Sequence, residues 1–116
     1  MGNRWLASIA SRNGRERVEL VDLRNGQPVP LPGINQADAQ PISVSVSADG
    51  NRIALIRSRD GRTELMLYRR GVGILQRLPM EPAGVPREVS LDGSGRLLAV
   101  QVSRQGRWDV DLIRLP

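Results

Sequence analysis

Apolar and polar residues alternate along short stretches of the chain, which is the pattern of half-buried β-strands. The clearest stretch is 42–46, where isoleucine and valine alternate with serine. A period of two sends successive side chains to opposite faces of a sheet, and no helical pattern in the chain exceeds one turn. The ten predicted strands are 5–10, 18–23, 29–31, 42–46, 52–57, 63–68, 74–78, 87–91, 97–102 and 108–113.

Turn residues separate these strands at regular intervals. Asn13-Gly14 and Asp60-Gly61 favour tight hairpins, because both central residues of such a turn need positive φ. Pro28 and Pro30 remove backbone donors, so the third predicted strand should lie at a sheet edge. The stretches 32–41 and 79–86 are interpreted as polar connectors. Ten short strands with glycine turns predict an all-β protein.

The chain also repeats itself. The stretches 7–15, 54–62 and 99–107 share the frame Ala-x-x-x-Ser-Arg-x-Gly-Arg, and successive copies begin 47 and 45 residues apart. A period just above 40 residues is the size of one four-stranded propeller blade. We therefore expect one domain, 1–116, of antiparallel four-stranded meanders. The expected blades are about 3–32, which lacks its innermost strand, about 42–79, and about 87–116, which lacks its outermost strand.

The middle repeat resembles a known family. Ser-Ala-Asp-Gly-Asn-Arg-Ile-Ala-Leu at 47–55, Ser-Arg-Asp-Gly at 58–61 and Glu-Leu-Met-Leu-Tyr at 64–68 are similar to the TolB-like β-propeller repeat, also called the WD40-like PD40 repeat. The chain departs from that pattern at Ala48, where proline is usual, and at 90–96, which has extra residues. The resemblance covers nearly the whole chain. It implies a propeller fold and an exported, periplasmic or lipid-anchored location.

A chain of this length cannot close a ring of such blades. Propellers have about four to eight blades, and an open stack exposes apolar blade faces at both ends. We expect a homodimer of two three-blade chains that forms a six-bladed ring, since symmetric homodimers are the commonest assemblies. The alternative is an open stack that a partner or further residues complete.

The composition excludes several kinds of covalent, metal-binding and catalytic chemistry. The chain of 116 residues contains no Cys, His, Phe or Lys, so disulfides, the usual zinc ligands and Ser-His or Ser-Lys nucleophiles are excluded. No catalytic residue, metal or cofactor is expected. Asp109 and Asp111 are interpreted as solvated, outward positions that alternate with Val110 and Leu112; the alternative is a metal or acid–base pair, since both face the same side of one strand. No apolar run reaches the roughly 20 residues of a membrane helix, and we expect no signal peptide in this sequence.

Arginine carries all of the positive charge, and the formal net charge is +5. One arginine recurs at the tip of the central hairpin of each repeat, and a second arginine directly follows the turn glycine. In a propeller these tips fall on one rim, which an acidic protein, a lipid headgroup or a polyanion would recognise; the alternative is a solubilising turn residue. Nearby Glu16, Glu64 and Asp109 would reduce this field. The rim candidates are Arg12, Arg59 and Arg104, enlarged by Arg15, Arg62 and Arg107.

Trp108 is the remaining candidate, because it opens a strand beside a turn. It is suited either to stacking on a sugar, as in propeller lectins, or to covering the edge of the core. Aromatic residues are otherwise scarce, with only Trp5 and Tyr68 besides it, and this speaks against nucleic-acid binding, which uses aromatic stacking platforms.

The sequence therefore predicts a non-enzymatic binding or scaffolding module that acts through protein–protein contacts. One alternative is a lectin-like binder of small ligands in the central channel or between blades. Another is a polyanion binder at the arginine-rich rim. A third is a propeller separated from a catalytic hydrolase domain. Propellers host many activities, so the fold alone does not choose among them.

Overall fold

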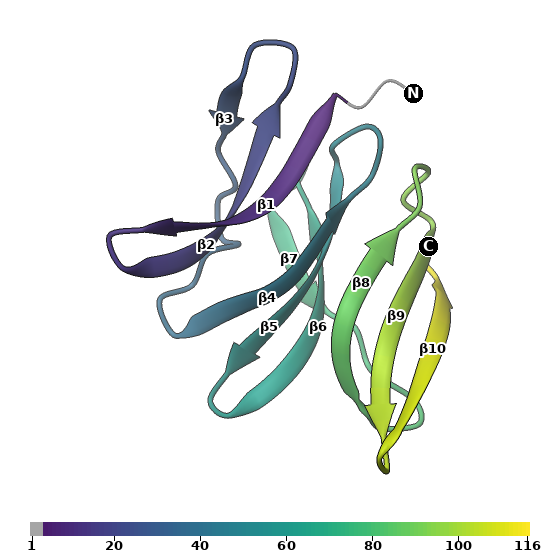
Figure 1. Ribbon diagram of the computed structural model, residues 1–116. Coiled ribbons are helices and arrows are strands. Elements are labelled where there is room, and N and C mark those ends of the chain that lie inside the picture. Colours follow the sequence, from purple (N-terminus) through teal and green to yellow (C-terminus); the bar gives the residue numbers. More distant parts are fainter. Residues whose placement is uncertain (1–3) are drawn as a thin grey trace.

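The computed structural model describes residues 4–116 and contains three antiparallel sheets (Figure 1). Sheet A has the order β1 (Trp5–Arg12), β2 (Arg15–Asp22), β3 (Gln27–Val29). Sheet B has the order β4 (Ala39–Val46), β5 (Arg52–Arg59), β6 (Arg62–Arg69), β7 (Ile74–Arg77). Sheet C has the order β10 (Arg107–Arg114), β9 (Leu97–Arg104), β8 (Val85–Leu91). Nine of the ten predicted strands are confirmed with shifted ends, whereas the third lies at Gln27–Val29 instead of 29–31. It does lie at a sheet edge, as predicted, and the described residues contain no helix.

The strands of each central hairpin extend further toward the turn than the sequence predicted. Asn13 and Gly14 both have positive φ, 54° and 77°, and the flanking strands pair up to Arg12 and Arg15. The hairpins at Asp60-Gly61 and Gln105-Gly106 have the same form. Since two-residue turns with positive φ match the twist of the strands, each strand extends to the edge of its turn.

The predicted connectors are wrong at their ends, because β4 already begins at Ala39 and β8 at Val85. Pro41 and Pro86 lie within these two stretches, and proline removes a backbone donor from a strand. In the structure the register shifts between Pro41 and Ser43 and between Pro86 and Glu88. A bulge is a place where a strand tolerates proline, so both innermost strands accommodate it without ending.

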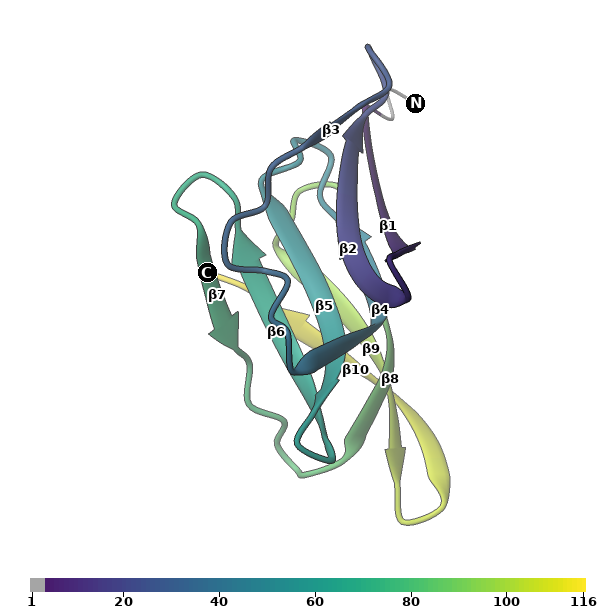
Figure 2. The ribbon, with the colours of Figure 1, turned by 90° about the vertical axis from the view of Figure 1, so that its left-hand side faces the viewer.

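The three sheets stack face to face, with sheet B in the middle (Figures 1 and 2). Strand β4 packs on β1 and β2 of sheet A, and β8 packs on β4, β5 and β6 of sheet B. Strand β5 is buried on both faces, so that Ile53 and Leu55 enter one core and Ala54 and Ile56 enter the other. Each innermost strand thus covers the face of the preceding sheet.

Polar contacts fix the stacking of the sheets. The hydroxyl oxygens of Ser43 and Ser45 on β4 accept hydrogen bonds from the backbone N–H groups of Val89 (3.2 Å) and Leu91 (2.9 Å) on β8. The Tyr68 hydroxyl donates to the carbonyl oxygen of Pro32 at 2.8 Å. These bonds satisfy polar groups that the apolar core would otherwise leave unpaired.

The Asp-Gly turn of the repeat is held by its own aspartate. The Asp49 carboxylate accepts hydrogen bonds from the Ser47 hydroxyl (2.6 Å) and the Asn51 N–H (2.9 Å), and these bonds lower the pKa of Asp49. Gly50 has φ of 73° and lies under the indole ring of Trp5. The turn between β4 and β5 therefore needs both an aspartate and a glycine.

Candidate functional site

The three rim arginines lie at the hairpin tips, as the repeat predicted, but each is bound to an acid. Arg12 donates to both carboxylate oxygens of Glu19, at 2.9 and 3.2 Å. Arg104 pairs with Asp111, with one bond of 2.8 Å, and Arg59 donates to Asp38 at 3.0 Å. These guanidinium groups lower the pKa of Glu19, Asp38 and Asp111. Ion pairing reduces the positive field that these three arginines present to solvent.

The acids that were expected to reduce the field are mostly engaged elsewhere. Glu64 accepts a hydrogen bond from the buried Arg57 at 3.1 Å, and Glu16 accepts one from Gln40 at 2.8 Å. Of these three acids, Asp109 alone has a carboxylate oxygen within 4.0 Å of a rim arginine in the described part of the chain, 3.6 Å from the Arg104 guanidinium. The neutralising acids sit seven residues after their arginine in two of the three sheets.

The second set of arginines is less engaged. Arg15, Arg62 and Arg107 begin β2, β6 and β10, and all three are exposed. In the described part of the chain none of them lies within 4.0 Å of a carboxylate. Free guanidinium groups retain their donors for an anionic ligand.

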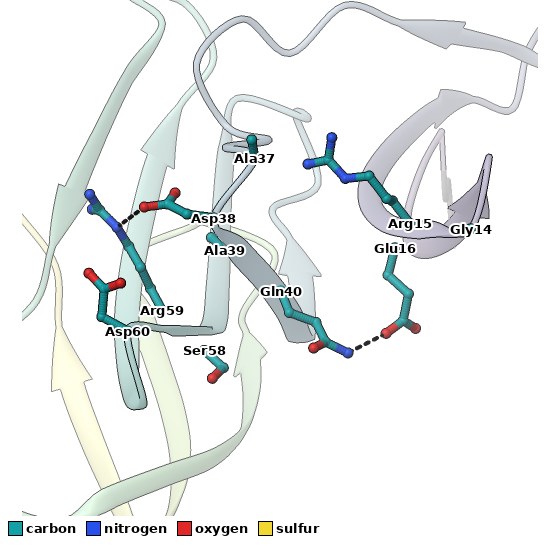
Figure 3. A pocket seen from close by; sticks show the side chains of 10 residues that line it. All are labelled: Gly14, Arg15, Glu16, Ala37, Asp38, Ala39, Gln40, Ser58, Arg59 and Asp60. Atoms are coloured by element: carbon teal, nitrogen blue, oxygen red, sulfur yellow. Dashed lines mark hydrogen bonds and ion pairs between the residues drawn. The ribbon is translucent and has the colours of Figure 1, made fainter.

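A polar groove of about 450 Å³ lies between the hairpin tips of sheets A and B (Figure 3). Its lining comes from the tips of both central hairpins and from the start of β4. Figure 3 shows the paired Arg59 and Asp38 on one side and the Glu16–Gln40 hydrogen bond below them. The groove is lined by Gly14, Arg15, Glu16, Ala37, Asp38, Ala39, Gln40, Ser58, Arg59 and Asp60.

The corresponding positions between sheets B and C make different contacts. There the Arg104 guanidinium donates two hydrogen bonds to the carbonyl oxygen of Pro82, at 3.1 and 2.9 Å. Gly84 lies so close to Val102 that a Cβ atom would stand 2.5 Å from its side chain. The groove acids Glu16, Asp38 and Asp60 are matched in this repeat by threonine, alanine and glutamine. Among residues 4–116, the positions that line the groove at sheets A and B thus carry different side chains and contacts at sheets B and C.

Sequence reasoning missed Asp38 and Gln40, which lie at the end of a stretch interpreted as a connector. The repeated frame did identify Arg15 and Arg59, which also line the groove. The second connector carries different residues at the positions of Asp38 and Gln40. This difference between the two connectors was the available signal.

The outward face of β10 is apolar, which corrects the sequence prediction. Val110 and Leu112 are 64% and 68% exposed, whereas Asp109 and Asp111 point back toward Arg104. The prediction was wrong because alternation defines two faces of a strand without saying which one meets the core. Trp108 lies on the same outward face and is 69% exposed, so it does not cover the core edge.

The sheet stack matches a solved structure. Superposition on the crystal structure of TolB from Acinetobacter baumannii gives a TM-score of 0.71 at 19% sequence identity, over 97% of this chain. The chain shares the fold of TolB propeller blades. The expected TolB-like resemblance is thereby confirmed for the fold, and the chain spans 27% of the length of that TolB chain. No family model and no curated protein matches the chain.

Two further findings concern metal sites and membrane-spanning helices. Residues 4–116 hold no cluster of three or more acidic side chains arranged to bind a metal ion. Among the same residues, no helix has the length and hydrophobicity to cross a membrane.

Proposed function

We propose that the chain is a non-enzymatic binding and scaffolding module that contacts other proteins through the outward face of sheet C. The observation that carries this proposal is a comparison of equivalent positions. Val110 and Leu112 hold the repeat positions of Leu65 and Leu67 on β6, which are 1% and 0% exposed beneath sheet C. The same positions on β2 are also buried, beneath sheet B. Sheet C therefore presents the surface that the next sheet covers twice within this chain.

Burial of this face would contribute favourable free energy to association. Burial of a valine or leucine side chain contributes about 1.5–3 kcal/mol, and the exposed Trp108 adds a larger surface. Ser90 on β8 holds the position of Ser45, whose hydroxyl binds the backbone of the following sheet. Ser90 is exposed, so it is available for an equivalent bond.

We propose a second copy of the chain as the first such protein, with sheet A of one copy on sheet C of the other. Leu6 on the outward face of sheet A is 50% exposed, and Val21 beside it is half-buried. Two such contacts would give the six-bladed ring. Strand β1 would be the inner strand of its blade, because sheet A has three strands and no innermost fourth.

The absence of cysteine makes a face-specific test simple. Ser8→Cys marks the outward face of sheet A, and Gln101→Cys marks that of sheet C. Their repeat equivalents at the interface of sheets B and C are Val100 and Ile56, which share one core. With a short bismaleimide, a mixture of the two variants should give a covalent dimer. Either variant alone should give no covalent dimer; cross-linking of Gln101→Cys with itself contradicts the head-to-tail arrangement.

The groove between sheets A and B favours a second function, the binding of a small polar ligand between blades. It offers the Arg15 guanidinium and the Asp60 carboxylate, which have no ion-pair partner within 4.0 Å among residues 4–116. Screening an array of oligosaccharides and dipeptides tests this function. A ligand of the groove should bind wild type and be lost in Asp60→Asn and Arg15→Gln, while Trp108→Ala, far from the groove lining, should retain it.

We also propose an exported or periplasmic location, with or without a lipid anchor. The likeness to TolB blades supports it. Cell fractionation of the native host tests it, and recovery of the protein with cytoplasmic markers would contradict it.

A further inference from the structure

The groove between sheets A and B presents one unpaired charge of each sign, on opposite sides. Arg15 begins β2 in sheet A, and Asp60 lies at the tip of the hairpin between β5 and β6 in sheet B (Figure 3). Among residues 4–116, neither side chain has an opposite charge within 4.0 Å. The other charged lining residues are bonded to neighbours within the groove: Glu16, Asp38 and Arg59. A ligand there meets one available guanidinium and one available carboxylate.

Short hairpin turns and the packing of the sheets hold the two groups in place. Arg15 directly follows Gly14, and Asp60 directly precedes Gly61, in two-residue turns whose flanking strands pair up to the turn. Such turns match the twist of the strands and leave the backbone little freedom. Strand β4 packs on β1 and β2, which fixes sheet A against sheet B. The backbone positions of both charged residues are therefore set by the fold, and a ligand that bridges them must have a matching length.

The charges of the lining discriminate among ligand classes. They comprise two arginines and three acids, so an anion that reaches Arg15 also meets an excess of carboxylates. A cation that reaches Asp60 approaches the unpaired Arg15. A neutral sugar would desolvate both groups without pairing either, which is costly, and the described lining has no aromatic side chain on which its ring could stack. A zwitterion pairs both groups through charge-assisted hydrogen bonds.

The size of the groove and its uncharged lining indicate a short chain with small side chains. The groove has a volume of about 450 Å³, within the roughly 300–1,000 Å³ of small-molecule sites. Gly14, Ala37 and Ala39 offer little surface to a large apolar side chain. The Ser58 hydroxyl and the Gln40 amide supply neutral donors and acceptors, which suit the amide groups of a peptide.

We propose that the groove binds a short zwitterionic peptide, with its terminal carboxylate on Arg15 and its terminal ammonium group on Asp60. The next sheet interface provides an internal comparison, since Arg62 and Gln105 hold the equivalent positions there. Glutamine carries no charge, so the interface of sheets B and C keeps the partner of the carboxylate and lacks that of the ammonium group. The proposal rests on the small-ligand function of the groove and names the chemical class of that ligand.

The probe is triglycine, which has both terminal charges and no side chains. It is titrated into the isotope-labelled 116-residue chain, and backbone amide chemical shifts report both affinity and location. Triglycine should bind with a dissociation constant in the millimolar range and shift the signals of Arg15 and Asp60. N-acetyl-triglycine lacks the ammonium group and triglycine amide lacks the carboxylate, so each should bind about fivefold more weakly, as expected for the loss of one exposed ion pair.

Two protein variants connect each terminal charge to one residue. Arg15→Gln should weaken the binding of triglycine about fivefold and that of triglycine amide hardly, because the amide has no carboxylate to lose. Asp60→Asn should weaken the binding of triglycine by a similar factor and that of N-acetyl-triglycine hardly. Arg107→Gln makes the same change at an exposed repeat equivalent of Arg15, and this variant should bind all three peptides as wild type does.

Three outcomes would overturn the proposal: no binding of triglycine to wild type, shifts that lie outside the groove, or equal effects of Arg15→Gln on triglycine and its amide. A neutral oligosaccharide that binds wild type and is lost in Arg15→Gln and Asp60→Asn, without binding of triglycine, would support the small-ligand function and overturn its zwitterionic ligand. The cross-linking of the sheet faces involves no peptide, so it reports on the protein-binding function alone.

Discussion

Leu112 of β10 and Leu67 of β6 occupy the same position of the repeat in opposite environments. Leu67 is fully buried beneath sheet C, whereas Leu112 is 68% exposed. The difference arises from the neighbour, since β8 covers sheet B and no described strand covers sheet C.

This pair gives a direct prediction for stability. Leu67→Ala should lower the free energy of unfolding by about 2–5 kcal/mol, as for other buried leucines. Leu112→Ala should change it by less than about 0.5 kcal/mol, as at exposed positions. Urea denaturation at high dilution, where association is absent, measures both. Similar losses for the two variants would mean that the face of sheet C is already covered.

Gly50 and Gly61 allow the cost of a contact to be separated from the cost of a backbone conformation. Both have positive φ, 73° and 72°, but a Cβ at Gly50 would stand 2.5 Å from the Trp5 ring, whereas a Cβ at Gly61 would have no such neighbour within 4 Å. Gly61→Ala should cost about 1–2 kcal/mol, the strain of left-handed backbone. Gly50→Ala should cost clearly more, because Trp5 must also move. Chemical denaturation of the two variants compares them, and equal losses would contradict the Trp5 packing.

Ion-paired carboxylates should make stability depend on acid pH. The folded pKa values of Glu19, Asp22 and Asp111 lie below their ordinary values because of Arg12, Arg4 and Arg104. The unfolded chain therefore takes up protons first, so this stability is present above the ordinary carboxyl pKa near 4 and is lost as pH falls through the folded values.

Thermal unfolding midpoints between pH 2 and 7 test this dependence. Asp111→Asn and Arg104→Gln should both flatten the acid limb, because each removes the same ion pair. An Asp111→Asn profile that is parallel to wild type over this range would show that the pair does not contribute to the titration.

The two sets of rim arginines should differ in anion binding. Heparin retention that falls steeply with salt would indicate polyanion contacts. Replacing Arg15, Arg62 and Arg107 by glutamine should lower the eluting salt concentration more than replacing Arg12, Arg59 and Arg104. Arg12, Arg59 and Arg104 must first leave Glu19, Asp38 and Asp111, although both triple variants lose the same formal charge. A larger effect of replacing Arg12, Arg59 and Arg104 would contradict this assignment.

The strands and central hairpins could be predicted from the sequence because their signals are local. Alternation marks the strands, and Asn13-Gly14 and Asp60-Gly61 fix the turns. The starts of β4 and β8 could not be predicted, since Pro41 and Pro86 oppose a strand locally and are accommodated only by bulges that depend on the partner strand.

The sites depend on contacts between sheets, and these have weaker signals. The pairing of Arg59 with Asp38 joins residues 21 positions apart, and no periodicity marks such a pair. The orientation of β10 did have a signal. The repeat aligns Val110 with Val18 and Leu65, which shows the face that each sheet presents to the next one.

The central claim is that another protein sheet, first of all from a second copy, covers the outward face of sheet C. Its most direct test is the solution mass, measured by light scattering over a dilution series for wild type and Leu112→Glu. The account predicts a mass near twice 12.8 kDa for wild type at high concentration and a 12.8 kDa monomer for the variant. A wild-type chain that stays at 12.8 kDa at every concentration would contradict the ring of two chains.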